Sequence, residues 1–244
     1  MRFGSVEALR RIDLAVGSNE ILGLIGDNGA GKSTLIKIMT GVLTPTSGRL
    51  FVRDQPVDLS DYSVSRARAL GIETVHQETS LGEKQPLWRN FFVGRQITNR
   101  FGFINVKRQR EIADQILKDK IGFRGVGIDA DSMVAKLSGG ERQGVAIGRA
   151  MHFESDLIIL DEPTVALAVK EVQKVLDFVT SIKRAGRACI YIDHNLAHVH
   201  SIADRMVIID RGTIVAEVQK GDMTVDELTR HVINLQQIEA QAVA

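Results

Sequence analysis

Cysteine is almost absent from this chain, which contains only Cys189 among its 244 residues. A single thiol cannot form a disulfide within the chain, so the composition fits a reducing compartment. Cys189 lies inside the apolar run 188–192. This position predicts a buried structural thiol rather than a reactive one.

Long apolar runs and a large net charge are missing as well. No stretch approaches the roughly 18 apolar residues that a membrane-spanning helix needs, and the N-terminus lacks the apolar segment of a secretory signal. The formal net charge is +1, which gives no general attraction to nucleic acid or anionic lipid, although a local basic patch stays compatible with it. We therefore expect a soluble chain with no nucleic-acid partner, whose role at any membrane comes through a partner protein.

The order of the predicted elements favours an α/β core interrupted by a helical insertion. Buried strands are predicted at 21–25, 72–76, 157–160 and 188–192, helices at 34–40, 60–70 and 170–184, and a hairpin at 206–218. Between 81 and 153 the periodicity is helical, with amphipathic helices at 106–120 and 140–152.

We predict that these elements form one domain spanning 1–244. Its α/β core comprises 1–79 and 155–235, and its helical subdomain comprises 80–154. Thr224 and Glu227 have the spacing of a capping box that begins a last helix. The low-complexity tail 236–244 is expected to fray.

A glycine-rich loop is the strongest chemical motif. The segment 26–33, Gly-Asp-Asn-Gly-Ala-Gly-Lys-Ser, fits the phosphate-binding pattern G-x-x-x-x-G-K-[ST] between a buried strand and a helix. Glycines allow backbone N–H groups to curl around a polyphosphate. We expect Lys32 to reach the β- and γ-phosphates of a nucleotide and Ser33 to hold Mg²⁺. A glycine-rich turn without a ligand would leave Lys32 without a role.

Two carboxylates follow the predicted strand 157–160. Asp161 and Glu162 therefore lie at the carboxyl end of a buried strand, where parallel sheets bind ligands. Asp161 is placed to hold the Mg²⁺ shell and Glu162 to polarise a water molecule. The alternative is a strand that leaves the core through acidic residues, and the upstream phosphate loop disfavours it.

A second glycine pair begins the predicted helix 140–152. Ser138 and Glu141 have the spacing of a capping box, which explains both residues without any ligand. It does not explain Gly139 and Gly140, because each glycine weakens a helix by up to about 1 kcal/mol. Backbone N–H groups left open at a helix N-terminus would explain them, so we predict a second anion site.

The run Leu-Ser-Gly-Gly-Glu-Arg-Gln at 137–143 resembles the signature motif of the ATP-binding subunits of ABC transporters. The resemblance covers nearly the whole chain. It implies a P-loop NTPase core, with a RecA-like mixed sheet and an antiparallel edge, plus an inserted helical subdomain. It also implies a head-to-tail homodimer in which Ser138, Gly139, Gly140 and Glu141 contact the ATP held by the partner's phosphate loop.

The resemblance assigns further roles by matching motifs. It implies that Gln77 senses Mg²⁺ and the attacking water, that His194 contacts the γ-phosphate, and that Phe3 stacks on adenine. The ATP-binding set it implies is Phe3, Gly26, Asn28, Gly29, Gly31, Lys32, Ser33 and Thr34; Mg²⁺ is assigned to Ser33, Gln77 and Asp161; catalysis is assigned to Glu162, His194, Gln77 and Lys32. Local sequence alone leaves two alternatives open: a polar residue leaving a strand at Gln77, and a core hydrophobe at Phe3.

Three positions depart from the family pattern. Ala168 stands where the family normally has an aspartate at the end of the loop after the acidic pair. Its absence puts in doubt the coupling between the two subunits through that carboxylate. Asp193 replaces the serine that usually precedes the switch histidine. Only two residues precede Phe3, where the family has a full strand, and this favours a late or trimmed start.

The segments 71–78, 88–95 and 143–150 resemble the ATPases of bacterial monosaccharide importers. This implies an ATP-hydrolysing subunit at the cytoplasmic face of the inner membrane, bound to permease subunits and served by a periplasmic sugar-binding protein. One alternative is an importer ATPase for another solute, such as a nucleoside or an autoinducer. Another is an ABC ATPase of translation or DNA repair, which the lack of tandem cassettes and of coiled coils disfavours.

Two smaller patterns have open or weaker interpretations. Trp88, Phe91, Phe92 and Val93 would either line an apolar groove that receives a permease helix or form the core of the helical subdomain. The group His194, His198 and His200 suggests a metal site by spacing, but no cysteine or carboxylate cluster accompanies it in the sequence.

Overall fold

The computed structural model describes residues 1–75, 81–122, 127–153 and 155–242. The chain divides into two compact units, which we describe separately. Unit 1 contains Met1–Thr74, Ser155–Glu162 and Thr180–Ala244, and unit 2 contains Val75–Glu154 and Pro163–Val179. The sequence prediction assigned 163–179 to the α/β core, whereas the contacts of this segment group it with the helical unit.

Unit 1 is built on a six-stranded sheet in the order β10-β9-β3-β8-β7-β6. Its strands are β3 (Ile21–Ile25), β6 (Ile72–Val75), β7 (Leu157–Asp161), β8 (Ala188–Ile192), β9 (Arg205–Asp210) and β10 (Thr213–Gln219). The pairings β3–β8, β3–β9 and β7–β8 are parallel, and β10 pairs antiparallel with β9 at the edge. This is the mixed sheet with an antiparallel edge that was predicted.

Short antiparallel pairs and further helices also belong to unit 1. The pairs are β1 (Arg2–Phe3) with β2 (Val6–Glu7) and β4 (Leu50–Val52) with β5 (Gln55–Val57). The helices are α1 (Lys32–Met39), α2 (Val64–Ala69) and α7 (Leu196–Ile202), followed by the terminal α8 (Val225–Ala242).

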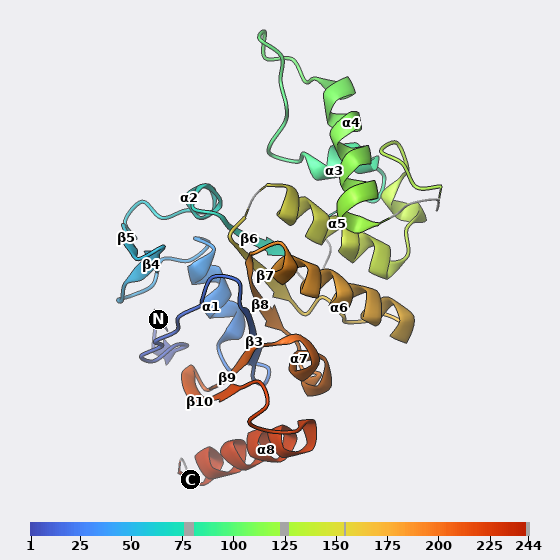
Figure 1. Ribbon diagram of the computed structural model, residues 1–244. Coiled ribbons are helices and arrows are strands. Elements are labelled where there is room, and N and C mark those ends of the chain that lie inside the picture. The colour runs from blue at the N-terminus through green and yellow to red at the C-terminus, as the bar shows by residue number, and fades with distance from the viewer. Residues whose placement is uncertain (76–80, 123–126, 154, 243–244) are drawn as a thin grey trace. The chain divides into compact units, whose positions relative to one another are not determined.

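Strand β3 is the centre of the unit because it is buried on both faces. Leu22 and Leu24 pack in one core cluster with Leu35 of α1. Gly23 points to the other face, where an added Cβ would lie 2.3 Å from Cγ1 of Val199 on α7. Figure 1 shows α1 and α7 on opposite sides of β3. The missing side chain at Gly23 therefore allows α7 to pack directly on the strand.

The last helix begins as predicted and extends further than predicted. The N–H of Thr224 donates to Oε2 of Glu227 at 2.8 Å, and the N–H of Glu227 donates to Oγ1 of Thr224 at 3.3 Å, which confirms the capping box. The backbone is helical through Ala242, whereas the sequence predicted a frayed tail from 236.

Unit 2 is helical, as the periodicity predicted. It contains α3 (Leu87–Phe91), α4 (Val106–Ile116), a π-helical turn Leu117–Ile121, a 3₁₀ turn Val134–Lys136, α5 (Gly139–His152) and most of α6 (Val169–Arg184). The predicted helix 106–120 is thus α-helical only to Ile116. No helix in the described part of the chain combines the length and hydropathy that crossing a bilayer requires.

The aromatic residues of α3 belong to the core of unit 2. Trp88, Phe91 and Phe92 are 6%, 0% and 1% exposed, and they pack in one cluster with Ile116 and Val145. Val93 is exposed. Of the two interpretations left open by the sequence, these three rings therefore fit the core residues and do not line an open groove.

Candidate nucleotide site

The phosphate-loop segment has backbone geometry that only glycine can provide at two of its fixed positions. A Cβ on Gly26 would lie 2.3 Å from the backbone oxygen of Ile209. Gly31 has φ +109°, and a Cβ there would lie 2.9 Å from the backbone oxygen of Ala8. Helix α1 begins at the next residue, Lys32, and no side chain caps its N-terminus within the described residues. Its first N–H groups are therefore open to an anion.

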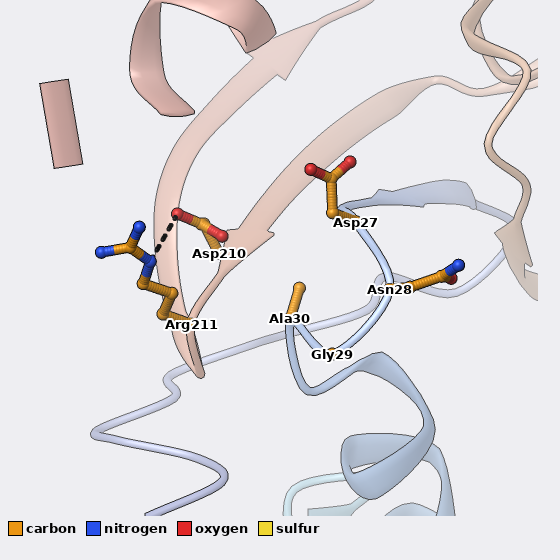
Figure 2. Close-up of a pocket in the computed structure, with 6 residues that line it drawn as sticks. All are labelled: Asp27, Asn28, Gly29, Ala30, Asp210 and Arg211. Atoms are coloured by element: carbon orange, nitrogen blue, oxygen red, sulfur yellow. Dashed lines mark ion pairs between the residues drawn. The ribbon is translucent and has the colours of Figure 1, made fainter. Parts of the chain in front are cut away.

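Two cavities adjoin this loop. Figure 2 shows one of them, between the loop residues 27–30 and the end of β9, where the side chains of Asp210 and Arg211 pair. The other cavity brings the beginning of α1 together with an acid from the end of β7. Its lining residues are Ala8, Asp27, Asn28, Gly29, Gly31, Lys32, Ser33, Thr34 and Glu162. The second cavity thus contains most of the predicted ATP-binding set and the predicted base.

Lys32 is buried at the bottom of the loop. Its Nζ donates to the backbone oxygen of Gly26 and, at 3.0 Å, to that of Asp27. Burial lowers the pKa of the Lys32 ammonium, and the nearby carboxylates of Glu162 and Asp161 oppose that shift. The predicted phosphate-binding cation and the two predicted acids are therefore close enough to interact electrostatically.

The acidic pair sits where the strand pattern predicted it, at the end of β7. Asp161 pairs in register with Ile192 of β8. Glu162 follows with φ +52°, a left-handed conformation that is rare outside glycine, and its N–H donates to the oxygen of Ile192 at 2.9 Å. Such conformations concentrate at functional sites, where the surrounding structure holds them.

His194 contacts Glu162 directly. The His194 Nε2 lies 3.0 Å from the Glu162 Oε2, with the carboxylate mostly buried and the imidazole half-exposed. The imidazole is therefore positioned to orient the carboxylate that borders the cavity. Local sequence did not predict this contact, because Glu162 and His194 follow the ends of two neighbouring strands, β7 and β8, and are 32 positions apart in the numbering.

The carboxylate of Asp193 anchors the segment that carries His194. It is 4% exposed. Its Oδ2 accepts from the hydroxyl of Tyr191 at 2.8 Å and lies 3.2 Å from Nδ1 of His198, while its Oδ1 accepts from the N–H of Asn195 at 2.9 Å. The departure from serine at this position is therefore accommodated by a hydrogen-bonded network around a buried carboxylate.

The signature turn in unit 2 forms the predicted capping box. Oγ of Ser138 accepts from the N–H of Glu141 at 3.3 Å, and the N–H of Ser138 donates to Oε2 of Glu141 at 2.9 Å. The two glycines have a packing reason that the sequence analysis missed. A Cβ on Gly139 would lie 2.5 Å from Cδ2 of Leu167, and one on Gly140 would lie 2.9 Å from Cβ of Glu171.

Glu171 occupies the space next to Ala168, where the family has an aspartate. Its Oε2 accepts from the N–H of Ala168 at 3.2 Å, and its Oε1 accepts from the N–H of Gly140 at 3.4 Å. The N–H of Ala168 and the hydroxyl of Ser138 lower the pKa of the Glu171 carboxyl. This carboxylate therefore joins the segment after the acidic pair to the signature turn.

Some predicted residues are not brought to the cavity. Phe3 lies on β1, is 46% exposed and lines neither of the two cavities at the loop. Gln77 lies outside the described residues. His200 binds the backbone oxygen of Met223 at 2.8 Å instead of joining a metal site, and the described part of the chain holds no group of three or more potential metal-binding side chains from His, Cys, Asp and Glu.

Comparisons with known proteins identify relatives along nearly the full chain. A xylose/arabinose import ATP-binding protein of Sulfolobus acidocaldarius is 39% identical over 227 residues, covering 93% of this chain and 88% of that protein. A fructose import ATP-binding protein of Rhizobium meliloti is 35% identical over 247 residues, covering 100% of this chain and 94% of that protein. A ribose import ATP-binding protein of Yersinia pestis is 32% identical, but this chain spans only 44% of it.

Solved structures share the fold. A nucleotide-free ATP-binding cassette from an ABC transporter matches with a TM-score of 0.81 at 23% identity, covering 97% of this chain and 95% of that one. A dimeric cassette in a post-hydrolysis state, bound to ADP and Pi, matches with a TM-score of 0.73 at 22% identity, covering 91% of this chain and 96% of that one. The ABC transporter family itself matches residues 9–165, which include the phosphate loop, the signature turn and the acidic pair. The chain therefore belongs to the ABC transporter family.

Proposed function

We propose that this chain hydrolyses ATP and thereby powers the import of a monosaccharide. One observation carries the catalytic part of the proposal: the cavity bordered by Lys32 and Ser33 is also bordered by Glu162, whose carboxylate is held by His194 at 3.0 Å. A phosphate-binding cation, a helix N-terminus and an oriented carboxylate in one cavity suit the attack of water on a terminal phosphate.

In the proposed reaction, water attacks the γ-phosphorus in line with the bond to the β–γ bridging oxygen. Glu162 accepts a proton from that water, the new P–O bond forms, and the bridging oxygen leaves with ADP. Lys32 and the N–H groups at the start of α1 stabilise the charge on the phosphates. His194 keeps the Glu162 carboxylate directed at the cavity. Lys32 must exchange its bonds to the loop carbonyls for bonds to phosphate oxygens.

Mg²⁺ fits the donors present at this site. Ser33 lines the cavity with a hydroxyl-bearing side chain, and Asp161 is the last residue of strand β7. Both supply the hard oxygen ligands that Mg²⁺ prefers, and Gln77 would supply a third. Bound there, the ion would neutralise charge on the β- and γ-phosphates.

We further propose that two copies pair head to tail, so that each ATP lies between one copy's phosphate loop and its partner's signature turn. Ser138, Gly139, Gly140 and Glu141 form a second helix N-terminus, which is suited to a γ-phosphate. The dimeric cassette that shares the fold is consistent with this arrangement.

The substrate assignment is supported by the relatives. Those that match over most of their own length are import ATP-binding proteins for xylose/arabinose and for fructose. We therefore propose that this chain acts at the cytoplasmic face of the membrane, bound to permease subunits, and that a periplasmic sugar-binding protein delivers the sugar. Nucleoside or autoinducer import is the alternative that the test must exclude.

The test is reconstitution of this chain with its partner permease, in proteoliposomes that contain ATP. We expect uptake of labelled xylose, arabinose, fructose or ribose that depends on ATP and on the binding protein, and no uptake with Glu162→Gln. Uptake of nucleosides but not of any of these sugars would reject the sugar assignment. ATP hydrolysis by the chain without any solute uptake would reject transport but retain the ATPase.

A further inference from the structure

The charge of this chain is unevenly distributed. The 27 residues from 84 to 110 contain seven lysines and arginines and no aspartate or glutamate, although the whole chain has a formal net charge of only +1. The remainder is therefore net acidic. The same segment contains the only tryptophan and four of the nine phenylalanines. No part of the nucleotide site lies within it.

Two of these five aromatic residues are exposed. Whereas Phe91 and Phe92 are in the core, Phe101 and Phe103 are 69% and 72% exposed and Ile104 is 50% exposed. They lie between α3 and α4, where the backbone runs out past the start of α4 and turns back (Figure 1). Contiguous exposed apolar side chains of this kind mark an interaction surface.

A defined turn holds these side chains in place. The N–H of Asn99 donates to the oxygen of Phe103 at 2.8 Å, and the N–H of Gly102 donates to the oxygen of Asn99 at 3.0 Å. The side chain of Asn99 accepts from the N–H groups of Phe101 and Phe103 at 2.9 and 3.1 Å. Thr98 and Ile104 form an antiparallel bridge. We call residues 97–105 the aromatic hairpin.

Basic side chains surround the aromatic hairpin. The guanidinium of Arg100 lies 4.6 Å from the centre of the Phe101 ring. Lys107 and Arg108 are exposed in the first turn of α4, where the chain returns from the hairpin. The nearest acid in sequence is Glu111, which pairs with Arg108 at 3.5 Å. Exposed rings and an aliphatic side chain flanked by cations match the interface of an anionic bilayer, where apolar groups enter the headgroup region and cations bind anionic lipids.

The alternative occupant is an acidic segment of a protein, and the shape of the hairpin disfavours it. A peptide is bound in a groove or along a free strand edge. A Cβ added at Gly102 would meet no atom within 4 Å, so the space around the turn is open. A convex tip that carries two exposed rings suits insertion into a lipid interface better than it suits enclosing a peptide.

We propose that the aromatic hairpin binds the surface of an anionic lipid bilayer, with Phe101, Phe103 and Ile104 in the interface and Arg100, Lys107 and Arg108 at the headgroups. This contact is additional to any contact with a permease. Because it needs neither ATP nor a permease, its test is independent of the proposed function.

The experiment is sedimentation of the full chain with vesicles of two compositions: phosphatidylcholine alone, and phosphatidylcholine mixed with phosphatidylglycerol. We expect binding to the mixed vesicles that weakens as NaCl is raised. Two variants should each bind the mixed vesicles at least about tenfold more weakly than the wild type. One is the double variant Phe101→Ser with Phe103→Ser, and the other is the triple variant Arg100→Ala, Lys107→Ala and Arg108→Ala. All variants should keep the circular-dichroism spectrum and the urea-unfolding midpoint of the wild type, which shows that they fold.

Phe51 provides a matched control, because its ring is likewise exposed, at 51%, and its centre lies 5.8 Å from the guanidinium of Arg49. It lies on β4, away from the hairpin in the sequence. Phe51→Ser should bind the mixed vesicles like the wild type. A tryptophan placed by Phe103→Trp should shift its emission to shorter wavelength when mixed vesicles are added, and one placed by Phe51→Trp should not.

Three outcomes would overturn the proposal. The first is that the wild type fails to sediment with mixed vesicles. The second is that the aromatic double variant binds these vesicles as well as the wild type does. Alternatively, the chain binds detergent-solubilised permease through Phe101 and Phe103 but binds no vesicles, which would assign the hairpin to a protein partner.

Discussion

The phosphate loop and the signature turn both begin a helix with glycine, but they treat their backbone N–H groups differently. Helix α1 starts after Gly31 with no capping side chain among the described residues, and Lys32 adds a buried cation beneath the loop. Helix α5 starts with a complete capping box, and a second carboxylate, Glu171, accepts from the N–H of Gly140.

This difference teaches that the two turns suit different roles toward the same ligand. The phosphate loop has open donors and a nearby cation, so it is suited to bind a polyphosphate by itself. The signature turn already satisfies its donors with its own acids. An incoming phosphate must replace or displace these carboxylates there, so this turn is suited to respond to a nucleotide that is already bound elsewhere.

The largest expected effect separates ATP hydrolysis from ATP binding at the phosphate loop. Glu162→Gln should lower the hydrolysis rate by about 10²- to 10⁴-fold, because the amide cannot accept the proton of the attacking water. ATP affinity should stay close to that of the wild type, since Lys32 and the loop are unchanged. Phosphate release measures the rate, and titration with a fluorescent ATP analogue measures the affinity.

Glu20→Gln is a poor control for that variant, because Glu20 forms a buried ion pair with Arg205 at 2.7 Å. Glu217→Gln is better, since this carboxylate pairs with the same Arg205 at 2.9 Å but is half exposed, and it is far from the loop in the sequence. A Glu162→Gln rate equal to that of the wild type would remove Glu162 as the base.

The next effect tests whether the loop binds nucleotide by itself. Lys32→Ala should weaken ATP binding by about 100-fold, because it removes charge-assisted hydrogen bonds to the β- and γ-phosphates. Lys37→Ala, which removes an exposed cation from the last turn of the same helix, should leave binding unchanged. Calorimetric titration with ATP measures both. Wild-type affinity in the Lys32 variant would make the loop a structural turn and would end the contrast with the signature turn.

A third test concerns the hydrogen bonds of Asp193, which hold the segment that carries His194. Asp193→Ala should destabilise the fold by about 1–3 kcal/mol, because the buried hydroxyl of Tyr191 loses its acceptor. Urea unfolding followed by circular dichroism measures the change. Asp61→Ala, at an exposed carboxylate of the same unit, should change stability by less than about 0.5 kcal/mol.

Asp193→Ser restores the residue that the family usually has. Serine is too short to replace all three contacts of the carboxylate, so this variant should also lose stability. Stability equal to that of the wild type in both variants would mean that the network around Asp193 contributes nothing to holding the His194 segment.

The sequence predicted the elements of the core because their patterns are local. The apolar run before Gly26, the strand that ends at Asp161 and the capping box at Ser138 each depend on neighbours in the chain, and each is present in the structure. Partners that are distant in sequence could not be predicted this way. The close packing of Leu167 on Gly139 was therefore missed, and the two glycines were explained by a ligand alone.

Exposure was equally hard to predict from local pattern. Phe91 and Phe101 occur in similar aromatic and basic contexts, yet one is fully buried and the other is 69% exposed. Helix α3 packs against α4 and α5, which covers Phe91, whereas the turn held by Asn99 directs the chain away from that core. Only the tertiary packing decides which aromatic residue remains on the surface.

The smallest expected effect tests the signature turn itself, through Glu171→Gln in a Glu162→Gln background. Because a carboxylate beside the N–H of Gly140 repels an incoming γ-phosphate, neutralising it should strengthen ATP-dependent dimerisation by about fivefold. Sedimentation velocity with ATP and Mg²⁺ measures the dimer fraction. Asp177→Asn, at an exposed acid on the same helix α6, should leave it unchanged. Weaker dimerisation in the Glu171 variant would mean that the carboxylate mainly positions the turn by joining it to Ala168. The signature turn would then resemble the phosphate loop in needing a rigid, preformed backbone, and the contrast between the two turns would lie only in what caps them.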